Sequence, residues 1–479
     1  MKNTMRLLFA TYVQLLAVAI QAQAIPDDVM QRAATLRDNA MRGSEAYRIV
    51  ESLTMEVGPR SAGSAGDKAG VLWAVDMLKS LGLKNVRREE VLVPHWDRGT
   101  ISVRITSPFP QSLVATSLGG SPGTAAEGIE AEVVRVESLA ELRALQSDDL
   151  QGRIVYIDHI MQRAKDGGGY SKASRIRSCG HVVAAERGAV ATIIRSAGTS
   201  THRVAHTGSM LKNFIPADIP GVAISNSDAD LLSYQMRSGM PVMLRLHSTA
   251  RFLPDVVSAN VIGEIPGRGD DADEIVLLAA HLDSWDLGTG AIDDGAGVAI
   301  VSAAAKLILD LDERPRRTIR VVLYADEEFG GKGAKQYLKD HADQVENHII
   351  GLEADFGSGR VWRIASQVAA GSLDIIDELH RLLAPINLER GDNKATGGAD
   401  LGPLRKAGMP VIGLTHDGTH YFDYHHTVDD TLDKINRDDL NQSVAAYTTA
   451  AFVAANIEQD FGRLPLIDKI TTCAAEDDK

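Results

Sequence analysis

The sequence has little cysteine, no excess of positive charge and a single long apolar run, and each shortage excludes a class of protein. Only Cys179 and Cys473 occur among 479 residues, so disulfides do not form the framework of the fold as they do in small secreted scaffolds. Whether these two cysteines pair is left open by the sequence. The net charge of -14 argues against a nucleic-acid partner, because phosphate binding needs a basic surface.

The long apolar run lies at the N-terminus. Lys2 and Arg6 precede "LLFATYVQLLAVAI", which leads to "AQA" at 22–24, a small-x-small motif typical of signal-peptidase cleavage. We therefore expect a signal peptide over 1–24 and a mature protein that is exported to the periplasm or the medium, without stable membrane association. An uncleaved anchor is the alternative, although the run is shorter than the ~20 residues that span a bilayer.

The rest of the chain alternates between strand and helix patterns. Apolar runs such as "EIVLLAA", "RTIRVVLYA" and "NHIIGLEA" are separated by helical patterns such as "AGVAIVSAAAKLILDLD". This alternation predicts an α/β fold, with a mostly parallel mixed sheet and helices on both faces. A separate β/α rhythm lies between its halves: short β runs and turns, then a helix over "HVVAAERG", which begins at His181, and a strand over "AVATIIRS". We expect a discontinuous α/β domain over 25–106 and 252–460, an inserted β-rich domain over 107–251, and a C-terminal tail over 461–479.

Acidic residues and histidines gather where the predicted strands end. The clusters are His281 with Asp283, the run from Asp326 to Glu328, Asp355, and the pair His425 and His426. Loops at the carboxyl ends of parallel strands meet at one edge of a sheet, where ligands bind. Several carboxylates at such an edge raise one another's pKa unless a cation neutralises them.

Taken singly, these residues have ordinary explanations. Asp293 or Asp294 alone would more often cap the following helix than bind a ligand, and adjacent glutamates are usually solvated. The shared position at strand ends favours a metal site instead. A mixture of imidazoles and carboxylates suits two divalent metal ions, with Zn²⁺ favoured and manganese or cobalt as alternatives.

Four segments, "HLDSWDLGTGAIDDGAG", "ADEEFGGKGAKQYL", "EADFG" and "YHHTVDDT", together resemble the co-catalytic dizinc exopeptidases of peptidase family M28. Further segments, including "VPHWDRG" and "EGIEAEVVRVESLAEL", extend the resemblance from about Ala46 to Ile457 and are similar to carboxypeptidase members of that family. The resemblance implies the zinc-exopeptidase fold with a protease-associated domain as the insert. It also implies a homodimer that acts on small peptides.

The resemblance also implies a ligand set. His281 and Asp355 would bind one metal, Glu328 and His426 the other, and Asp293 would bridge them. His426 is preferred over His425 because the family histidine precedes an Asp-Thr pair by a fixed gap, which Asp430 and Thr431 match. The resemblance further implies a cis peptide bond between Asp293 and Asp294.

The implied reaction is metal-assisted amide hydrolysis. Glu327 would act as the general base, taking a proton from metal-held water and passing it to the leaving amine. Asp283 would accept the second N-H of His281 and orient its ring.

Contacts with the substrate are less well defined. The segment "AHTG", with His206, and "GGGYSKASRIRSCGH", which we expect to be a loop, are candidates for lining the cleft, or else ordinary loops. Asp400, in "GGADLGPL", and His425 are further candidates for substrate binding.

The resemblance implies release of a C-terminal residue or cleavage of dipeptides. An aminopeptidase with the same metals is the alternative: Lys or Arg in the pocket would favour capture of a carboxylate, and Asp or Glu capture of an amine. A binding protein with a decayed site is a third possibility, which the filled ligand positions disfavour.

Overall fold

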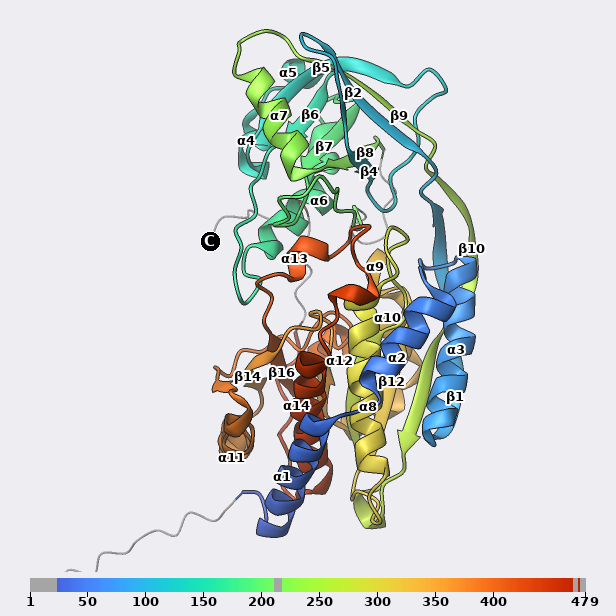
Figure 1. Ribbon diagram of the computed structural model, residues 1–479, viewed down its shortest axis with the longest axis vertical. Helices are drawn as coiled ribbons and strands as arrows, with labels where there is room; N and C mark the ends of the chain where they lie inside the picture. Colours follow the sequence, from blue (N-terminus) through green and yellow to red (C-terminus); the bar gives the residue numbers. More distant parts are fainter. Residues whose placement is uncertain (1–23, 211–217, 468–472, 474–479) are drawn as a thin grey trace, which may run out of the picture.

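The structure is a computed structural model that describes residues 24–210, 218–467 and 473. Most of the expected signal peptide and most of the far C-terminal tail lie outside the described residues. Two eight-stranded sheets dominate the fold, one in the lower half and one in the upper half of Figure 1. Within the described ranges, no helix has the length and apolar character needed to cross a membrane.

The lower sheet is mixed, as predicted. Its strands, in spatial order, are β1 (Lys84–Asp97), β10 (Arg251–Ile265), β12 (Thr318–Tyr324), β11 (Ile275–His281), β13 (His348–Glu353), β16 (Val411–His416), β14 (Val361–Gln367) and β15 (Glu389–Arg390). The four central strands run parallel, whereas β1 and β10 pair antiparallel on one side and β14 pairs antiparallel with β16 on the other.

Helices cover both faces of this sheet, which confirms that part of the prediction. Successive strand residues point to opposite faces: Val276 and Leu278 pack into the larger core, while Leu277 and Ala279 pack into the smaller one. The larger core is closed by α1 (Asp27–Arg42), α2 (Ala46–Ser52), α3 (Ala65–Leu81), α8 (Ala296–Leu309), α11 (Leu373–Leu383) and α14 (Arg437–Asn456). The smaller core is closed by α10 (Lys332–Asp340) and α12 (Gly402–Lys406).

Short helical segments lie mainly in the connections. They are α9 (Glu327–Gly330), α13 (Tyr421–Tyr424), η1 (Leu53–Val57), η2 (Gly269–Asp271), η3 (Ala291–Gly295), η4 (Ala342–Asn347), η5 (Ala370–Ser372), η6 (Ala384–Ile386) and η7 (Leu432–Lys434). Of these, η3, α9 and α13 lie beside the candidate site described below.

The upper sheet is formed by the middle of the chain. Its order is β3 (Gln111–Leu113), β2 (Ile101–Ser107), β9 (Met243–Ser248), β5 (Ile129–Val136), β6 (Ile154–Ile157), β7 (Ala191–Arg195), β8 (Gly221–Ile224) and β4 (Ala115–Ser117). The runs "EVVRV" and "VVLYA" lie in different sheets, in β5 and β12, as we expected. However, β2 already belongs to the upper sheet, so the change of sheet precedes the expected boundary at 107.

We expected this middle part to be β-rich with a helix near His181, and it carries helices on both faces. One core includes α7 (Asn226–Met236), and the other includes α4 (Leu139–Ala144), α5 (Ser147–Leu150) and α6 (Tyr170–Ala185). The reason is that β5, β6, β7 and β8 run parallel, and parallel neighbours need crossover connections, which are usually helical.

Two connections join the sheets. The chain leaves the lower sheet after β1 and returns at β10, and these strands form a long antiparallel ribbon that ends at the pair Asp97 and Arg251. A disulfide links Cys179 of α6 to Cys473 of the C-terminal segment, which answers the pairing question that the sequence left open.

Candidate metal centre

The candidate site lies at the carboxyl edge of the central parallel strands. His281 is the last residue of β11 and is in register with Tyr324 at the end of β12, so Glu327 and Glu328 follow within a few residues. Asp355 follows β13, which pairs with the other side of β11. The topology therefore brings side chains from distant sequence positions to one edge, as the alternating pattern predicted.

Asp293 lies at the centre of the cluster and is 4% exposed. Its Oδ1 is 3.2 Å from Nε2 of His281, and its Oδ2 is 3.1 Å from Nε2 of His426. Nε2 of His281 is also 3.5 Å from Oδ1 of Asp355. The two carboxylate oxygens of Asp293 thus face two different histidines, the arrangement expected of a bridging ligand.

Glu328 completes the side of the cluster that contains His426. Its Oε2 is 3.0 Å from Nε2 of His426 and accepts a hydrogen bond of 2.5 Å from Nε1 of Trp285. Its Oε1 is buried without a hydrogen-bond partner among the described residues. A buried carboxylate oxygen without a donor is costly, so this atom fits a metal ligand.

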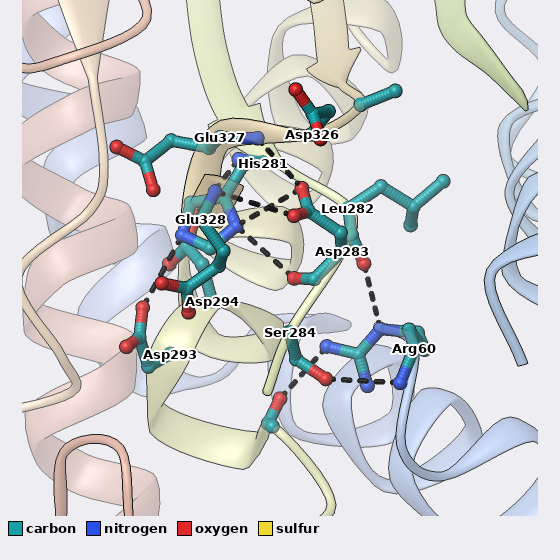
Figure 2. Close-up of polar contacts among 12 residues, drawn as sticks. Arg60, His281, Leu282, Asp283, Ser284, Asp293, Asp294, Asp326, Glu327 and Glu328 are labelled. Carbon is teal, nitrogen blue, oxygen red and sulfur yellow. Dashed lines mark hydrogen bonds and ion pairs between the residues drawn. The ribbon is translucent and has the colours of Figure 1, made fainter. Parts of the chain in front are cut away.

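Asp283 makes contacts that differ in part from the prediction. Nδ1 of His281 is 3.1 Å from the backbone carbonyl of Asp283, whereas its distance to the carboxylate is 3.6 Å. The carboxylate also accepts the backbone N-H groups of Glu327 and Glu328, at 3.1 and 3.3 Å (Figure 2). The carboxylate of Asp283 therefore fixes the start of α9, and its main chain orients the ring of His281.

The loop that carries Asp293 is held from several sides. The peptide bond between Asp293 and Asp294 is cis, as the resemblance implied. Asp294 accepts the backbone N-H of His281 at 3.1 Å and that of Gly297 at 3.0 Å, which is the capping role that we considered for it. Asp430 accepts the N-H groups of Ala291 and Ile292, both at 2.7 Å.

A buried arginine supports the same loop. The Arg60 side chain donates to the backbone carbonyls of Leu282, Thr289 and Gly290, at 2.7, 2.8 and 3.0 Å. Figure 2 shows its guanidinium beside Ser284, below the acidic cluster. Burial lowers its pKa to about 10 even though Asp430 and other carboxylates oppose this shift, so it remains a cation at neutral pH.

Crowding perturbs the acidic groups strongly. Burial raises the pKa of Glu327 well above its usual value; the charge of His281 opposes this, and Asp355 and Glu328 reinforce it. Burial also raises the pKa of Glu328, to about 6. Asp293 is the exception, because hydrogen bonds from His281 and His426 outweigh its burial and lower its pKa well below the usual range. Carboxyl groups crowded in this way can all ionise together only if a cation joins them.

Among the described residues, two groups of side chains have the chemistry and spacing of metal ligands. The ligand atoms of His281, Asp293 and Asp355 lie within 4.8 Å of one another, and so do those of Asp293, His425 and His426. Glu328 is not part of the second group but touches His426, as described above. Imidazole and carboxylate donors around a shared aspartate fit divalent metals of the zinc type.

A cavity of about 520 Å³ opens beside these groups. It is lined by predicted ligands and by residues from α6, α9 and α13, including Tyr170, Ser174 and Arg177. The segment "GGGYSKASRIRSCGH" therefore does line the cleft, but as a helix and not as the loop that we expected.

The three residues predicted to contact substrate take different positions. His425 lines the cavity and stacks on His426, with ring centres 3.5 Å apart. His206 is 1% exposed, and its Nδ1 contacts the backbone carbonyl of His425 at 2.8 Å. Asp400 is also 1% exposed, and neither of its carboxylate oxygens has a hydrogen-bond partner among the described residues. Neither His206 nor Asp400 is among the described residues that line the cavity.

The supporting roles of several residues were not identified from the sequence, which used Asp430 only to choose between His425 and His426. Trp285 and Asp430 stand inside the quoted segments "HLDSWD" and "YHHTVDDT", so their proximity to ligands was a usable signal. Arg60 carries no such signal, because it lies more than two hundred positions from the carbonyls that it binds.

The fold and site define a metal-dependent hydrolase with its ligands at the edge of a mixed α/β sheet. The sequence model described as peptidase family M28 matches residues 260–451. Carboxypeptidase Q of Xenopus laevis is 35% identical over 431 residues, covering 89% of this chain and 90% of that protein. Carboxypeptidase Q of Rattus norvegicus is 35% identical over 417 residues, covering 87% and 86%. The chain belongs to peptidase family M28.

Solved structures agree. A peptidase M28 precursor from Shewanella amazonensis superposes with a TM-score of 0.89 at 48% identity, covering 92% of this chain and 99% of that one. An aminopeptidase from Aneurinibacillus sp. strain AM-1 shares the fold, with a TM-score of 0.62 at 21% identity and coverage of 92% and 99%. The family and these relatives support the expectation of a metallo-exopeptidase.

Proposed function

We propose that the protein is a co-catalytic dizinc exopeptidase that releases C-terminal residues from small peptides or cleaves dipeptides. The observation that carries this proposal is the position of Asp293, whose two oxygens face His281 on one side and His426 on the other. The carboxypeptidase direction is supported by the relatives named carboxypeptidase Q. An aminopeptidase remains the second candidate, because a relative named aminopeptidase YwaD, from Bacillus subtilis, is 24% identical over 434 residues.

We assign His281 and Asp355 to one metal, Glu328 and His426 to the other, and Asp293 to both. Bound zinc would polarise the peptide carbonyl and lower the pKa of a bound water. A zinc aminopeptidase from Bacillus subtilis has a similar fold, and its metal supports the choice of zinc.

Glu327 is proposed as the general base. Its side chain lines the cavity, and its backbone is fixed by the Asp283 carboxylate. It would take a proton from the attacking water and deliver it to the leaving amine, so one carboxylate serves as base and then as acid. Asp283 is a positioning residue, because it holds the backbone of both glutamates.

The middle part of the chain, with the upper sheet, is proposed to be a protease-associated domain that closes the substrate cavity through α6. We retain 107–251 as its approximate extent, with β2 added, and 25–106 and 252–460 as the catalytic part.

Of the predicted substrate residues, His425 is retained as a direct contact. His206 is proposed to influence substrate binding indirectly, by positioning the backbone of His425. Asp400 is likewise proposed to have an indirect effect, through the position of the loop in which it lies. A homodimer is part of the same proposal.

Export is also proposed. The disulfide between Cys179 and Cys473 suits an oxidising compartment. The backbone N-H groups of Ala24 and Ile25 both donate to the Glu378 carboxylate, at 3.1 and 2.8 Å. Cleavage before Ile25 would turn the second donor into a free ammonium that pairs with this carboxylate, which is largely buried.

Metal removal and a panel of dipeptides test the proposal. A chelator should abolish cleavage, and added zinc should restore it, with two zinc ions bound per chain. Blocking the C-terminus alone should strongly reduce cleavage by a carboxypeptidase, to a small residual rate, and blocking the N-terminus alone would do so for an aminopeptidase. Loss with either block indicates a dipeptidase. Cleavage that is unaffected by complete metal removal would contradict the metal mechanism.

A further inference from the structure

The cavity beside the candidate metal centre contains one strongly basic side chain. Among its described lining residues, Arg177 is the only arginine, and there is no lysine. All the lining carboxylates, Asp293, Glu327, Glu328 and Asp355, already have proposed roles as ligands or base. The described lining therefore offers one cationic group to a substrate but no acidic group without a proposed role.

Arg177 is held rigidly on α6 and is 9% exposed. Its Nε donates to the backbone carbonyl of Ser209 at 3.1 Å, and Nη1 is 3.5 Å from that of Thr207. Its Cζ lies 5.5 Å from the centre of the Tyr170 ring. A methyl group at Gly208 would come within 2.4 Å of Cζ, so the bare backbone of this glycine makes room for the guanidinium.

No carboxylate of the described residues lies within the ion-pair distance of 4.0 Å from this guanidinium. A buried cation is normally paired with an anion, because neutral carbonyl oxygens replace only part of its hydration. The planar guanidinium fork matches a carboxylate in a bidentate geometry. An unpaired arginine beside the metal ligands is therefore suited to a carboxylate that arrives with the substrate.

We infer that Arg177 binds the free C-terminal carboxylate of the peptide and so directs the enzyme to the last peptide bond. This inference rests on the proposed function and deepens it, because it names the group that determines the direction of cleavage. With the carboxylate at Arg177, the rest of the peptide would occupy the cavity whose lining also includes Asp293 and Glu327. A cavity of about 520 Å³ lies within the roughly 300–1,000 Å³ typical of small-molecule sites.

The test combines two changes in the enzyme with one change in the substrate. Arg177→Gln removes the charge, and Arg177→Lys keeps the charge but loses the fork. Each variant is assayed on a dipeptide with a free C-terminus and on the same dipeptide with a C-terminal amide. We expect kcat/KM on the free acid to fall about 100-fold or more in Arg177→Gln, since loss of one partner of a buried charge pair is strongly unfavourable. Arg177→Lys should retain part of the activity, and residual cleavage of the amide should change little.

Lys172→Gln is the matched control, because it removes a positive charge from an exposed position on the same helix. It should leave both substrates unaffected, and zinc content should stay the same in every variant. Equal losses on the acid and the amide would overturn the role of Arg177 while leaving the peptidase function intact. Wild-type cleavage that needs a free amine but no free carboxylate would also overturn it, in favour of an aminopeptidase. No cleavage of any peptide by zinc-loaded wild type would refute the proposed function itself.

Discussion

At the scale of single residues, substitution of either of the adjacent glutamates at the start of α9 should reduce activity, but for different reasons. Glu327→Gln keeps the shape of the side chain and removes the proposed proton acceptor, so turnover should fall about 10²- to 10⁴-fold with zinc content unchanged. Glu328→Gln removes the negative charge from a proposed ligand that contacts His426 at 3.0 Å, so zinc content should fall first and activity with it.

Metal analysis and turnover measured on both variants decide between the roles. Loss of zinc from Glu327→Gln together with full zinc in Glu328→Gln would mean that the assignments are reversed. Full activity in either variant would place the chemistry elsewhere.

The sequence predicted the residues at this edge better than their contacts. His281, Asp293, Asp355 and His426 were found because strand ends and family motifs mark them, and the structure brings them together. The contacts of Asp283 were predicted only in part. Its carboxylate lies 3.6 Å from Nδ1 of His281, but it also accepts backbone N-H groups of α9, and the sequence does not reveal how a carboxylate divides its contacts between a ring nitrogen and backbone amides. Such choices depend on side-chain rotation within a packed loop.

At the scale of elements, the start of α6 was predicted incorrectly from the sequence. We expected a loop up to Gly180 and a helix only from His181, but the helix begins at Tyr170. The preceding "GGG" and the mixture of serine and basic residues are typical of loops. The apolar side chains of Ile176 and Cys179 form a buried helix face by packing against the upper sheet, and this packing is not visible in the local sequence. Arg177 was therefore not singled out, although its segment was.

Strand β6 ends at a buried ionic cluster that should make the upper sheet sensitive to acid. The carboxylate of Asp158 accepts hydrogen bonds from Arg195, Tyr156 and Ser233, at 2.7, 2.7 and 2.6 Å. Burial raises the pKa of Asp158, but these hydrogen bonds, with that from Ser233 the largest, outweigh it and leave the pKa below 3.8. Since the folded pKa is depressed, the stabilisation is present above the unfolded value and is lost as pH falls through the folded pKa.

Asp158→Asn should therefore destabilise the protein by ~3–5 kcal/mol at neutral pH, because it removes the buried carboxylate that pairs with Arg195 and leaves Arg195 with the exposed Asp230 as its carboxylate partner. Urea unfolding at pH 7 and near pH 3 measures this effect, and the difference from wild type should shrink at the lower pH. Asp230→Asn is the control, since this exposed carboxylate also contacts Arg195 and should cost at most ~1 kcal/mol. Equal effects of the two substitutions would contradict the importance of the buried cluster.

At the scale of the whole molecule, the discontinuous architecture could be predicted but its junctions could not. The change from long to short apolar runs indicated a separate middle part, and β5 and β12 do lie in different sheets. The strand β2 was misplaced because it continues directly from the ribbon of β1 with the same strand-like pattern. Pairing partners, and not local pattern, decide to which sheet such a strand belongs.

The disulfide between Cys179 and Cys473 ties the end of the chain to α6 across 294 positions. A link that closes a long loop reduces the entropy of the unfolded chain, typically stabilising the folded state by ~2–4 kcal/mol. The double variant Cys179→Ser, Cys473→Ser should therefore unfold at lower urea concentration than wild type. Wild-type protein produced with its N-terminal segment and exported should contain no free thiols, whereas protein produced in a reducing cytoplasm should contain two and match the double variant. Identical urea midpoints for all three forms would show that the link adds no stability, and free thiols in the exported protein would contradict the pairing itself.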